Sequence, residues 1–238
     1  MSAPLLEVAD LSVRYGEALA LDRVSFGLGA NQALAVLGSN GAGKSTLARA
    51  LSGLVPASSG TVSLEGADIT SRRAHAIRRA GVVHLPEGRG VFRGLTVLEN
   101  LRMGLTVDRA ARAEGLDLVF SIFPVLGERR RQLAGTLSGG EQQMLSLARA
   151  LMVRPKVVIA DEMSLGLAPK MVDVVFESLQ RARDAGSSVI MIEQFAGRAL
   201  AFADRAIILQ RGSLVWSGSA DTAGDELVRS YLGEGAGV

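Results

Sequence analysis

The chain has no cysteine, so it can form neither a disulfide nor a thiolate metal site, which fits a reducing compartment. Charges or turn residues interrupt every apolar run before the roughly 18 residues that a membrane-spanning helix needs. The N-terminus also lacks the basic segment and apolar stretch of an export signal. These absences predict a soluble or peripheral protein.

The chain also has little excess of charge of either sign and few aromatic side chains. The 26 basic and 24 acidic residues leave a net charge of only +2, so no overall field favours DNA, RNA or lipid. Aromatic residues make up 4% of the chain, which leaves little material for base-stacking platforms. We therefore expect no nucleic-acid partner. The two histidines, His75 and His84, match no catalytic pattern, and we expect them to be structural.

Apolar material is plentiful, at 48% of 238 residues, and its pattern predicts the fold class. Short alternating runs over residues 5–36 predict antiparallel strands. Later strands alternate with helices, which is typical of a mostly parallel sheet. Three helices with no strand between them, at residues 96–105, 108–123 and 138–153, break this alternation and predict a helical insert. A further helix is expected at residues 225–232.

Residues 38–46 read GSNGAGKST, a complete G-x-x-x-x-G-K-[ST] phosphate-binding loop. An apolar run precedes the loop and apolar residues at helical spacing follow it, which is the strand, loop and helix order that the motif requires. The alternative is a glycine-rich turn that merely starts a helix. The residues predicted to hold the nucleotide here are Gly38, Ser39, Asn40, Gly41, Ala42, Gly43, Lys44, Ser45 and Thr46.

Each part of this loop has a chemical role in phosphate binding. Its glycines allow backbone angles that are closed to other residues, so that N–H groups can turn towards a β-phosphate at the helix N-terminus. We expect the Lys44 ammonium to reach the β- and γ-phosphates and to act in catalysis. The Ser45 hydroxyl is expected to ligate Mg²⁺.

A second anion receptor is predicted where residues 137–143 read LSGGEQQ. Ser138 and Glu141 have the S-x-x-E spacing of a capping box, which satisfies two N–H groups at a helix start. Gly139 and Gly140 leave the same helix N-terminus open to close approach by an anion, which capping alone does not need.

A pair of carboxylates, Asp161 and Glu162, ends the apolar strand predicted at residues 157–160. This is the arrangement of a Walker B segment. Asp161 is placed to hold Mg²⁺ through water, and Glu162 to orient or deprotonate the water that attacks a γ-phosphate. The alternative is that the two carboxylates cap the segment that follows.

The motifs GSNGAGKST, LSGGEQQ and VVIADE, in this order and spacing, resemble the ATP-binding subunits of ABC transporters over essentially the whole chain. The resemblance implies ATP and Mg²⁺ as cofactors and a head-to-tail dimer of homologous subunits that sandwiches two ATP molecules. In such a dimer Tyr15 would stack on adenine, and Ser138 and Gly140 would contact the γ-phosphate held by the partner. A place in the core is the alternative for Tyr15.

The expected fold is therefore α/β: a P-loop nucleotide-binding core with a mostly parallel sheet, an N-terminal antiparallel β subdomain and a helical insert. We expect residues 1–238 to form a single ABC-type ATPase domain. Residues 1–87 and 154–238 would form the α/β core with the β subdomain, and residues 88–153 the helical subdomain.

Three features narrow the resemblance to the Liv-type importers of branched-chain amino acids. Glu87 stands in LPEGRGVF where most family members carry glutamine, Gln194 stands in MIEQ where most carry a switch histidine, and residues 164–170 read SLGLAPK. The resemblance implies that Glu87 contacts nucleotide and metal. Gln194 cannot act as a protonatable switch, but its amide could bind the γ-phosphate or the attacking water. Met163 replaces the usual proline, which puts the local turn in question.

The resemblance also implies partners and a location. These are membrane permease subunits, an extracytoplasmic solute-binding protein acting indirectly, and a peripheral position at the cytoplasmic face of the cell membrane. Residues 87–92 are the region where a membrane partner could sense nucleotide state. Within it, contact with that partner and a place in the core are equal alternatives for Val91 and Phe92. The alternatives are an importer of urea or short amides, an ABC-type ATPase that acts on nucleic acid or ribosomes, and a non-catalytic regulator, which would be expected to lack Lys44 or Glu162.

Overall fold

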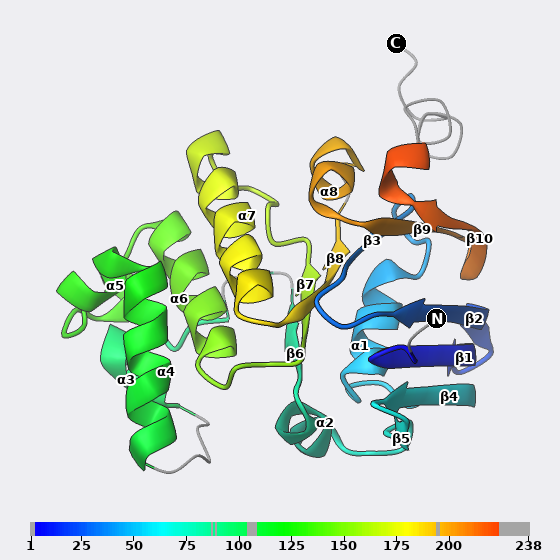
Figure 1. The fold of residues 1–238 in the computed structure, drawn as a ribbon, viewed down its shortest axis with the longest axis horizontal. Coiled ribbons are helices and arrows are strands. Elements are labelled where there is room, and N and C mark those ends of the chain that lie inside the picture. Colours follow the sequence, from blue (N-terminus) through cyan, green and yellow to red (C-terminus); the bar gives the residue numbers. More distant parts are fainter. Residues whose placement is uncertain (1–2, 87, 89, 104–108, 194–195, 224–238) are drawn as a thin grey trace.

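The computed structural model describes residues 3–86, 88, 90–103, 109–193 and 196–223, and it contains two β-sheets (Figure 1). The antiparallel sheet has the order β2-β1-β4-β5. Its strands are β1 (Leu6–Tyr15), β2 (Ala18–Leu28), β4 (Ser59–Leu64) and β5 (Ala67–Asp68). The antiparallel strands predicted near the N-terminus are thus confirmed.

The second sheet is mostly parallel and has the order β10-β9-β3-β8-β7-β6. Its strands are β3 (Ala33–Leu37), β6 (Val82–Leu85), β7 (Val157–Asp161), β8 (Ser188–Ile192), β9 (Arg205–Gln210) and β10 (Ser213–Ser219). Only β10, at one edge, pairs antiparallel with its neighbour. The predicted mostly parallel sheet is confirmed.

Each face of the parallel sheet is covered, which explains why its central strands β3, β7 and β8 are buried and mostly apolar. Helix α1 (Lys44–Leu51) and the antiparallel sheet cover one face, and α6 (Gly139–Leu151), α7 (Pro169–Asp184) and α8 (Ala196–Phe202) contribute to the core on the other. Successive side chains of a strand point to opposite faces. In β7, Val157 and Ile159 therefore lie on the α1 side, and Val158 and Ala160 on the other.

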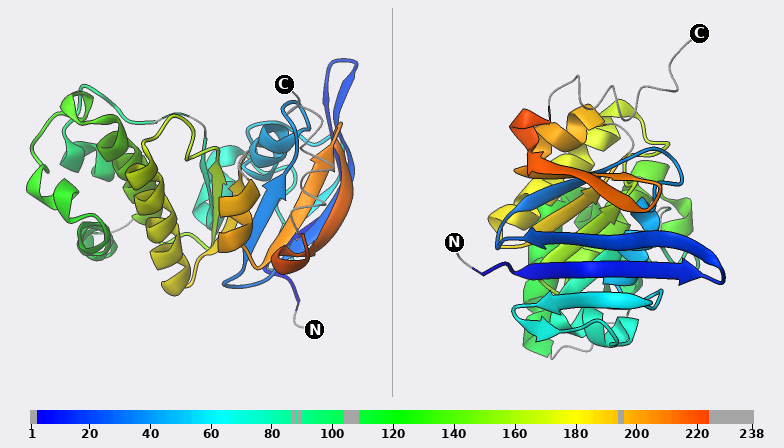
Figure 2. Two further views of the ribbon diagram at one scale, coloured as in Figure 1. Left: turned by 90° about the horizontal axis from the view of Figure 1, so that it is seen from above. Right: turned by 90° about the vertical axis from the view of Figure 1, so that its right-hand side faces the viewer.

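The helices between β6 and β7 form a group at one end of the molecule, on the left in Figure 1 and behind the antiparallel sheet in the right-hand view of Figure 2. Besides α6, the group contains α3 (Val97–Arg102), α4 (Arg109–Ile122) and α5 (Pro124–Glu128). Helix α2 (Ala74–Ala80) precedes β6. This group is the expected helical insert, although its boundaries at residues 88 and 153 stay a prediction.

Several predicted elements differ from the observed ones at their ends. The helix that the apolar spacing predicts from Lys44 to about Leu54 ends at Leu51. The helices expected over 96–105 and 138–153 are also shorter. Helices α5 and α8 were not predicted, because 5 and 7 residues are too few to show a helical repeat. The helix expected over 225–232 lies outside the described residues. Within the described ranges, no helix is long and apolar enough to cross a membrane.

Candidate functional site

The phosphate-binding loop connects β3 to α1, and close packing on both sides requires two of its glycines. A Cβ atom on Gly38 would lie 2.4 Å from the carbonyl oxygen of Leu209 in β9. A Cβ atom on Gly43, whose φ is 104°, would lie 2.8 Å from the carbonyl oxygen of Ala20 in β2. The loop is therefore held against two strands that are far from it in the sequence.

The N-terminus of α1 is open to an anion. Its N-cap residue is Gly43, no side chain caps it, and the first turn contains no acidic residue. Unpaired N–H groups and the positive end of the helix dipole therefore face the loop. Gly41 has a φ of 79° and open space where a Cβ would lie, so its side of the loop is free for close approach.

Lys44 is buried at the start of α1 and its ammonium is held within the loop. The Nζ atom donates hydrogen bonds to the carbonyl oxygens of Gly38, at 2.9 Å, and Ser39, at 3.1 Å. Burial lowers the pKa of Lys44, and the negative charges of Glu162 and Asp161 oppose this change. An ammonium has three N–H groups, so one remains for a phosphate oxygen.

Ser45 and Asp161 meet although 116 residues separate them. The Ser45 hydroxyl donates to Oδ1 of Asp161 over 3.3 Å, and the Asp161 side chain is buried at the end of β7. One hydroxyl and one carboxylate suit Mg²⁺, which binds oxygen ligands and usually keeps waters and substrate phosphates as further ligands. Two of the three predicted metal-binding residues are thus placed together.

Glu162 directly follows Asp161 and lines the cleft at the loop. Its backbone is in the left-handed region, with φ 50°, and its N–H donates to the carbonyl oxygen of Ile192 over 2.9 Å. A non-glycine residue in this region is strained and is held there by its surroundings. The turn places neighbouring carboxylates in different environments, because Asp161 is buried and Glu162 is half-buried beside Lys44 and Ser45.

The cleft at this loop has a volume of about 430 Å³. Its lining residues are Leu19, Ala20, Asn40, Gly41, Gly43, Lys44, Ser45, Thr46, Glu162, Arg211 and Gly212. No motif marks the residues from β2 and from the turn between β9 and β10, so they could not be predicted from the sequence. Hydrogen bonds place that turn: Gly212 donates to Ala42 over 3.0 Å and accepts from Asp22 over 2.9 Å.

Tyr15 lies at the end of β1, opposite Ala18 in the hairpin with β2. It is 46% exposed, so the alternative that placed it in the core is wrong. It is not among the residues that line the cleft. Its stacking on adenine stays a prediction.

The capping box predicted in LSGGEQQ is confirmed at the start of α6. The Ser138 N–H donates to Oε2 of Glu141 over 2.8 Å, and the Glu141 N–H donates to the Ser138 hydroxyl over 3.3 Å. Burial opposes the charged form of Glu141, but the hydrogen bonds from Ser138 and the nearby Arg129 outweigh it and lower the pKa. The Arg129 Nε atom lies 3.1 Å from Glu141 Oε1.

Gly140 has a packing role within its own subunit. It is buried against α7, where a Cβ atom would lie 2.4 Å from Cε of Met171. Glycine at this position therefore lets α6 approach α7 closely, whether or not an anion binds nearby.

The segment after Glu162 is tied to two other parts of the chain by contacts that the sequence analysis missed. Met163 is buried, and Gln143 of LSGGEQQ donates to its sulfur over 3.0 Å. Ser164 donates to Glu193 through its hydroxyl over 2.7 Å and through its N–H over 3.3 Å. Burial raises the pKa of Glu193, which is 4% exposed. Predicted site residues Glu87 and Gln194 lie outside the described residues.

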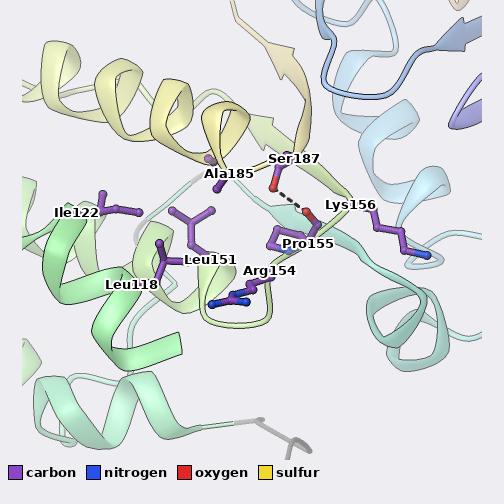
Figure 3. A pocket seen from close by; sticks show the side chains of 10 residues that line it. Leu118, Ile122, Leu151, Arg154, Pro155, Lys156, Ala185 and Ser187 are labelled. Atoms are coloured by element: carbon purple, nitrogen blue, oxygen red, sulfur yellow. Dashed lines mark hydrogen bonds between the residues drawn. The ribbon is translucent and has the colours of Figure 1, made fainter. Parts of the chain in front are cut away.

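A second cavity of about 270 Å³ lies between α4, α6 and the end of α7 (Figure 3). Leu118, Ile122 and Leu151 form its apolar part, and Lys156 points away from them. Lys156 is paired with Glu65 at 2.6 Å. No residue of the phosphate-binding loop lines this cavity, so it is separate from the nucleotide site.

The family model described as ABC transporter matches residues 21–164, which include the loop, LSGGEQQ and both carboxylates. The chain therefore belongs to the ABC transporter family. This family hydrolyses ATP, so the predicted class of enzyme is supported at the level of the family.

Two relatives of this ABC protein carry names that state a transported solute. It is 41% identical to the high-affinity branched-chain amino acid transport ATP-binding protein BraG of Pseudomonas aeruginosa, over 96% of this chain and 100% of the relative. It is 36% identical to the probable branched-chain amino acid transport ATP-binding protein LivF of Archaeoglobus fulgidus, over 91% and 93%.

A solved structure supports the predicted fold. It is an ATP-binding cassette of an ABC transporter in its ADP conformation, 25% identical, with a TM-score of 0.84 over 98% of this chain and 96% of that one. The predicted α/β class, with its mostly parallel and antiparallel sheets, is confirmed.

Proposed function

We propose that this chain is the Mg²⁺-dependent ATPase subunit that powers an importer of branched-chain amino acids. One observation carries the ATPase mechanism: Lys44, Ser45 and Glu162 line a single cleft, and Asp161 lies within reach of Ser45. The names of the two relatives support the choice of solute.

In this mechanism the loop holds the phosphates and the carboxylates prepare hydrolysis. Backbone N–H groups at the start of α1 and the Lys44 ammonium bind the β- and γ-phosphates. Ser45 and Asp161 would hold Mg²⁺, which would supply positive charge against the phosphate oxygens. Glu162 orients or deprotonates the attacking water, because it is half-buried at the edge of the cleft. Tyr15, Glu87 and Gln194 are proposed contacts that rest on the resemblance.

The proposed dimer with a homologous subunit would bring the second anion receptor to the nucleotide. Ser138, Gly139 and Gly140 are not among the residues that line the cleft of their own subunit. If these residues bind the γ-phosphate, they must therefore bind it in another subunit, which requires a head-to-tail arrangement. ATP would close this dimer, and hydrolysis would reopen it.

We further propose membrane permease subunits as direct partners, a solute-binding protein as an indirect one, and a peripheral position at the cytoplasmic face of the membrane. The family and the names of the relatives support the permease. The mechanism depends on it, because closure of the dimer can drive transport only when a permease transmits the motion.

Deletion of this subunit should abolish ATP-dependent uptake of leucine, isoleucine and valine at low external concentration. The intact chain should restore uptake, whereas Lys44→Ala should not, because it removes the ammonium that binds the phosphates. Lys156→Ala is the matched control: its side chain is exposed and paired with Glu65, away from the cleft, so it should restore uptake. Radiolabelled uptake measures the result. Loss of urea or short-amide uptake with unchanged branched-chain uptake would refute the solute but leave the ATPase intact.

A further inference from the structure

His84 lies on the same face of the parallel sheet as Asp161. Strands β6 and β7 pair in parallel with His84 opposite Ile159, so Asp161 is the next residue of β7 on that face. This is the face that α1 covers, since Val82 and Ile159 pack there with Leu47 of α1. The register of two strands therefore brings a histidine to a predicted metal ligand.

Both ring nitrogens of His84 face polar atoms. Nε2 lies 3.7 Å from Oδ2 of Asp161, and Nδ1 lies 3.3 Å from the hydroxyl oxygen of Ser52, just after α1. Only 5% of the His84 side chain is exposed. Yet Nε2, buried from solvent, has no hydrogen-bond partner within the described structure. Burying a polar atom without a hydrogen-bond partner lowers the stability of the folded state, so packing alone does not explain a histidine at this position.

The surrounding atoms favour a proton on Nε2. An ionised Asp161 can only accept hydrogen bonds, so the nitrogen that faces Oδ2 must donate. The Ser52 hydroxyl donates its one hydrogen to the carbonyl oxygen of Ala48 over 2.8 Å, so it is the weaker neighbour of the ring, at 3.3 Å from Nδ1, and the carboxylate decides where the proton lies. A small closing movement would turn the 3.7 Å contact into a hydrogen bond from Nε2 to Oδ2.

Each carboxylate oxygen of Asp161 would then accept a hydrogen bond of its own. Oδ1 accepts from Ser45, another predicted metal ligand, and Oδ2 faces His84. A carboxylate held at both oxygens cannot rotate freely, so its free lone pairs point in one direction. Hydrogen bonds of this kind orient metal ligands and strengthen metal binding.

We propose that His84 is a positioning residue that orients the Asp161 carboxylate for Mg²⁺ and thereby sets the affinity for Mg²⁺-nucleotide. His84 acts through Asp161 and touches neither nucleotide nor metal. The inference rests on the proposed function, because it assumes that Asp161 serves the metal. It replaces the expectation that His84 is only structural.

The test compares three substitutions in the full chain. His84→Gln keeps an N–H donor near the position of Nε2, His84→Asn reaches only the position of Nδ1, and His84→Leu has a similar size but no donor. Binding of a fluorescent ATP analogue is titrated with Mg²⁺ and repeated in EDTA. We expect the His84→Leu and His84→Asn substitutions to raise the half-saturating Mg²⁺ concentration by roughly 10- to 100-fold. The His84→Gln variant should keep most of the Mg²⁺ affinity of the unsubstituted chain. Metal-free binding should stay unchanged.

A packing role predicts the opposite order, because a buried amide without partners is less favourable than leucine. Equal or better Mg²⁺ affinity in the Leu variant than in the Gln variant would therefore overturn the proposal. If the His84→Leu variant fails to fold, the Mg²⁺ affinities of the His84→Gln and His84→Asn variants make the same test, because both side chains are amides and only glutamine reaches the position of Nε2. His75→Gln is the matched control, because His75 is exposed on α2 and should have no effect.

The outcomes also separate this inference from the proposed function. Unchanged Mg²⁺ dependence in the Leu and Asn variants, with normal binding in the unsubstituted chain, would refute the role of His84 alone. Absence of Mg²⁺-dependent nucleotide binding in the unsubstituted chain would refute the proposed function and this inference together.

Discussion

Glu162→Gln should lower the rate of ATP turnover by a factor of roughly 10² or more, because the amide cannot act as a base towards the attacking water. The affinity for ATP should survive. Lys44, Ser45 and Asp161 keep their contacts, and glutamine has the size and shape of the residue it replaces. Removal of a negative charge beside the phosphates would favour binding of the anionic nucleotide slightly.

Steady-state hydrolysis and equilibrium nucleotide binding should be measured on the same preparation of this variant. Glu177→Gln is the matched control, since it makes the same chemical change at an exposed position of α7 and should hydrolyse ATP normally. Hydrolysis by Glu162→Gln near the unsubstituted rate would remove Glu162 from its proposed role. Loss of binding together with turnover would instead indicate that the strained backbone at φ 50° needs the native side chain.

The second large effect is expected at the proposed ATP site that is shared between the loop of one subunit and the LSGGEQQ segment of its partner. Ser138→Arg places a bulky cation at the exposed start of α6, where the partner's γ-phosphate would lie. Lys44→Ala weakens the loop within its own subunit. Each variant alone should lose most ATPase activity. A heterodimer of the two contains one site built from an unaltered loop and an unaltered LSGGEQQ segment, so activity should partly recover on mixing.

ATPase assays on the separate and mixed variants, with heterodimers verified by two affinity tags, measure this recovery. Ser121→Arg serves as the control, because it adds the same cation to an exposed position of α4 in the same helical group. It should leave hydrolysis unchanged. No recovery in verified heterodimers would count against the shared site, or would show that both sites must act together.

Much of the candidate site was predictable because its chemistry is local. The loop from Gly38 to Thr46 depends on backbone angles and on the helix that follows it, and both are set by neighbouring residues. The same holds for the capping box of Ser138 and Glu141, which span a single helical turn. The meeting of Ser45 and Asp161 followed from the roles of two motifs, and their 3.3 Å contact agrees with those roles.

Other contacts were not predictable because no motif or periodic pattern marks them. Arg211 and Gly212 line the cleft only because β9 pairs with β3, which brings their turn beside the phosphate-binding loop. Met163 put the local turn in question, and in the structure it is buried with its sulfur accepting a hydrogen bond from Gln143. Gly140 was attributed to anion access, although its close packing against the Met171 side chain also favours a glycine.

By itself the sequence determined the α/β class, the strand, loop and helix order around the phosphates, and the carboxylate pair at the end of β7. These features depend on side-chain alternation, glycine backbone angles and helix caps, which act over a few residues. Only the tertiary structure decided which distant side chains meet outside the recognised motifs. The strand order β9-β3-β8-β7-β6 and the parallel register of β6 with β7 place His84 beside Asp161, because strand pairing fixes neighbours that chain order leaves open.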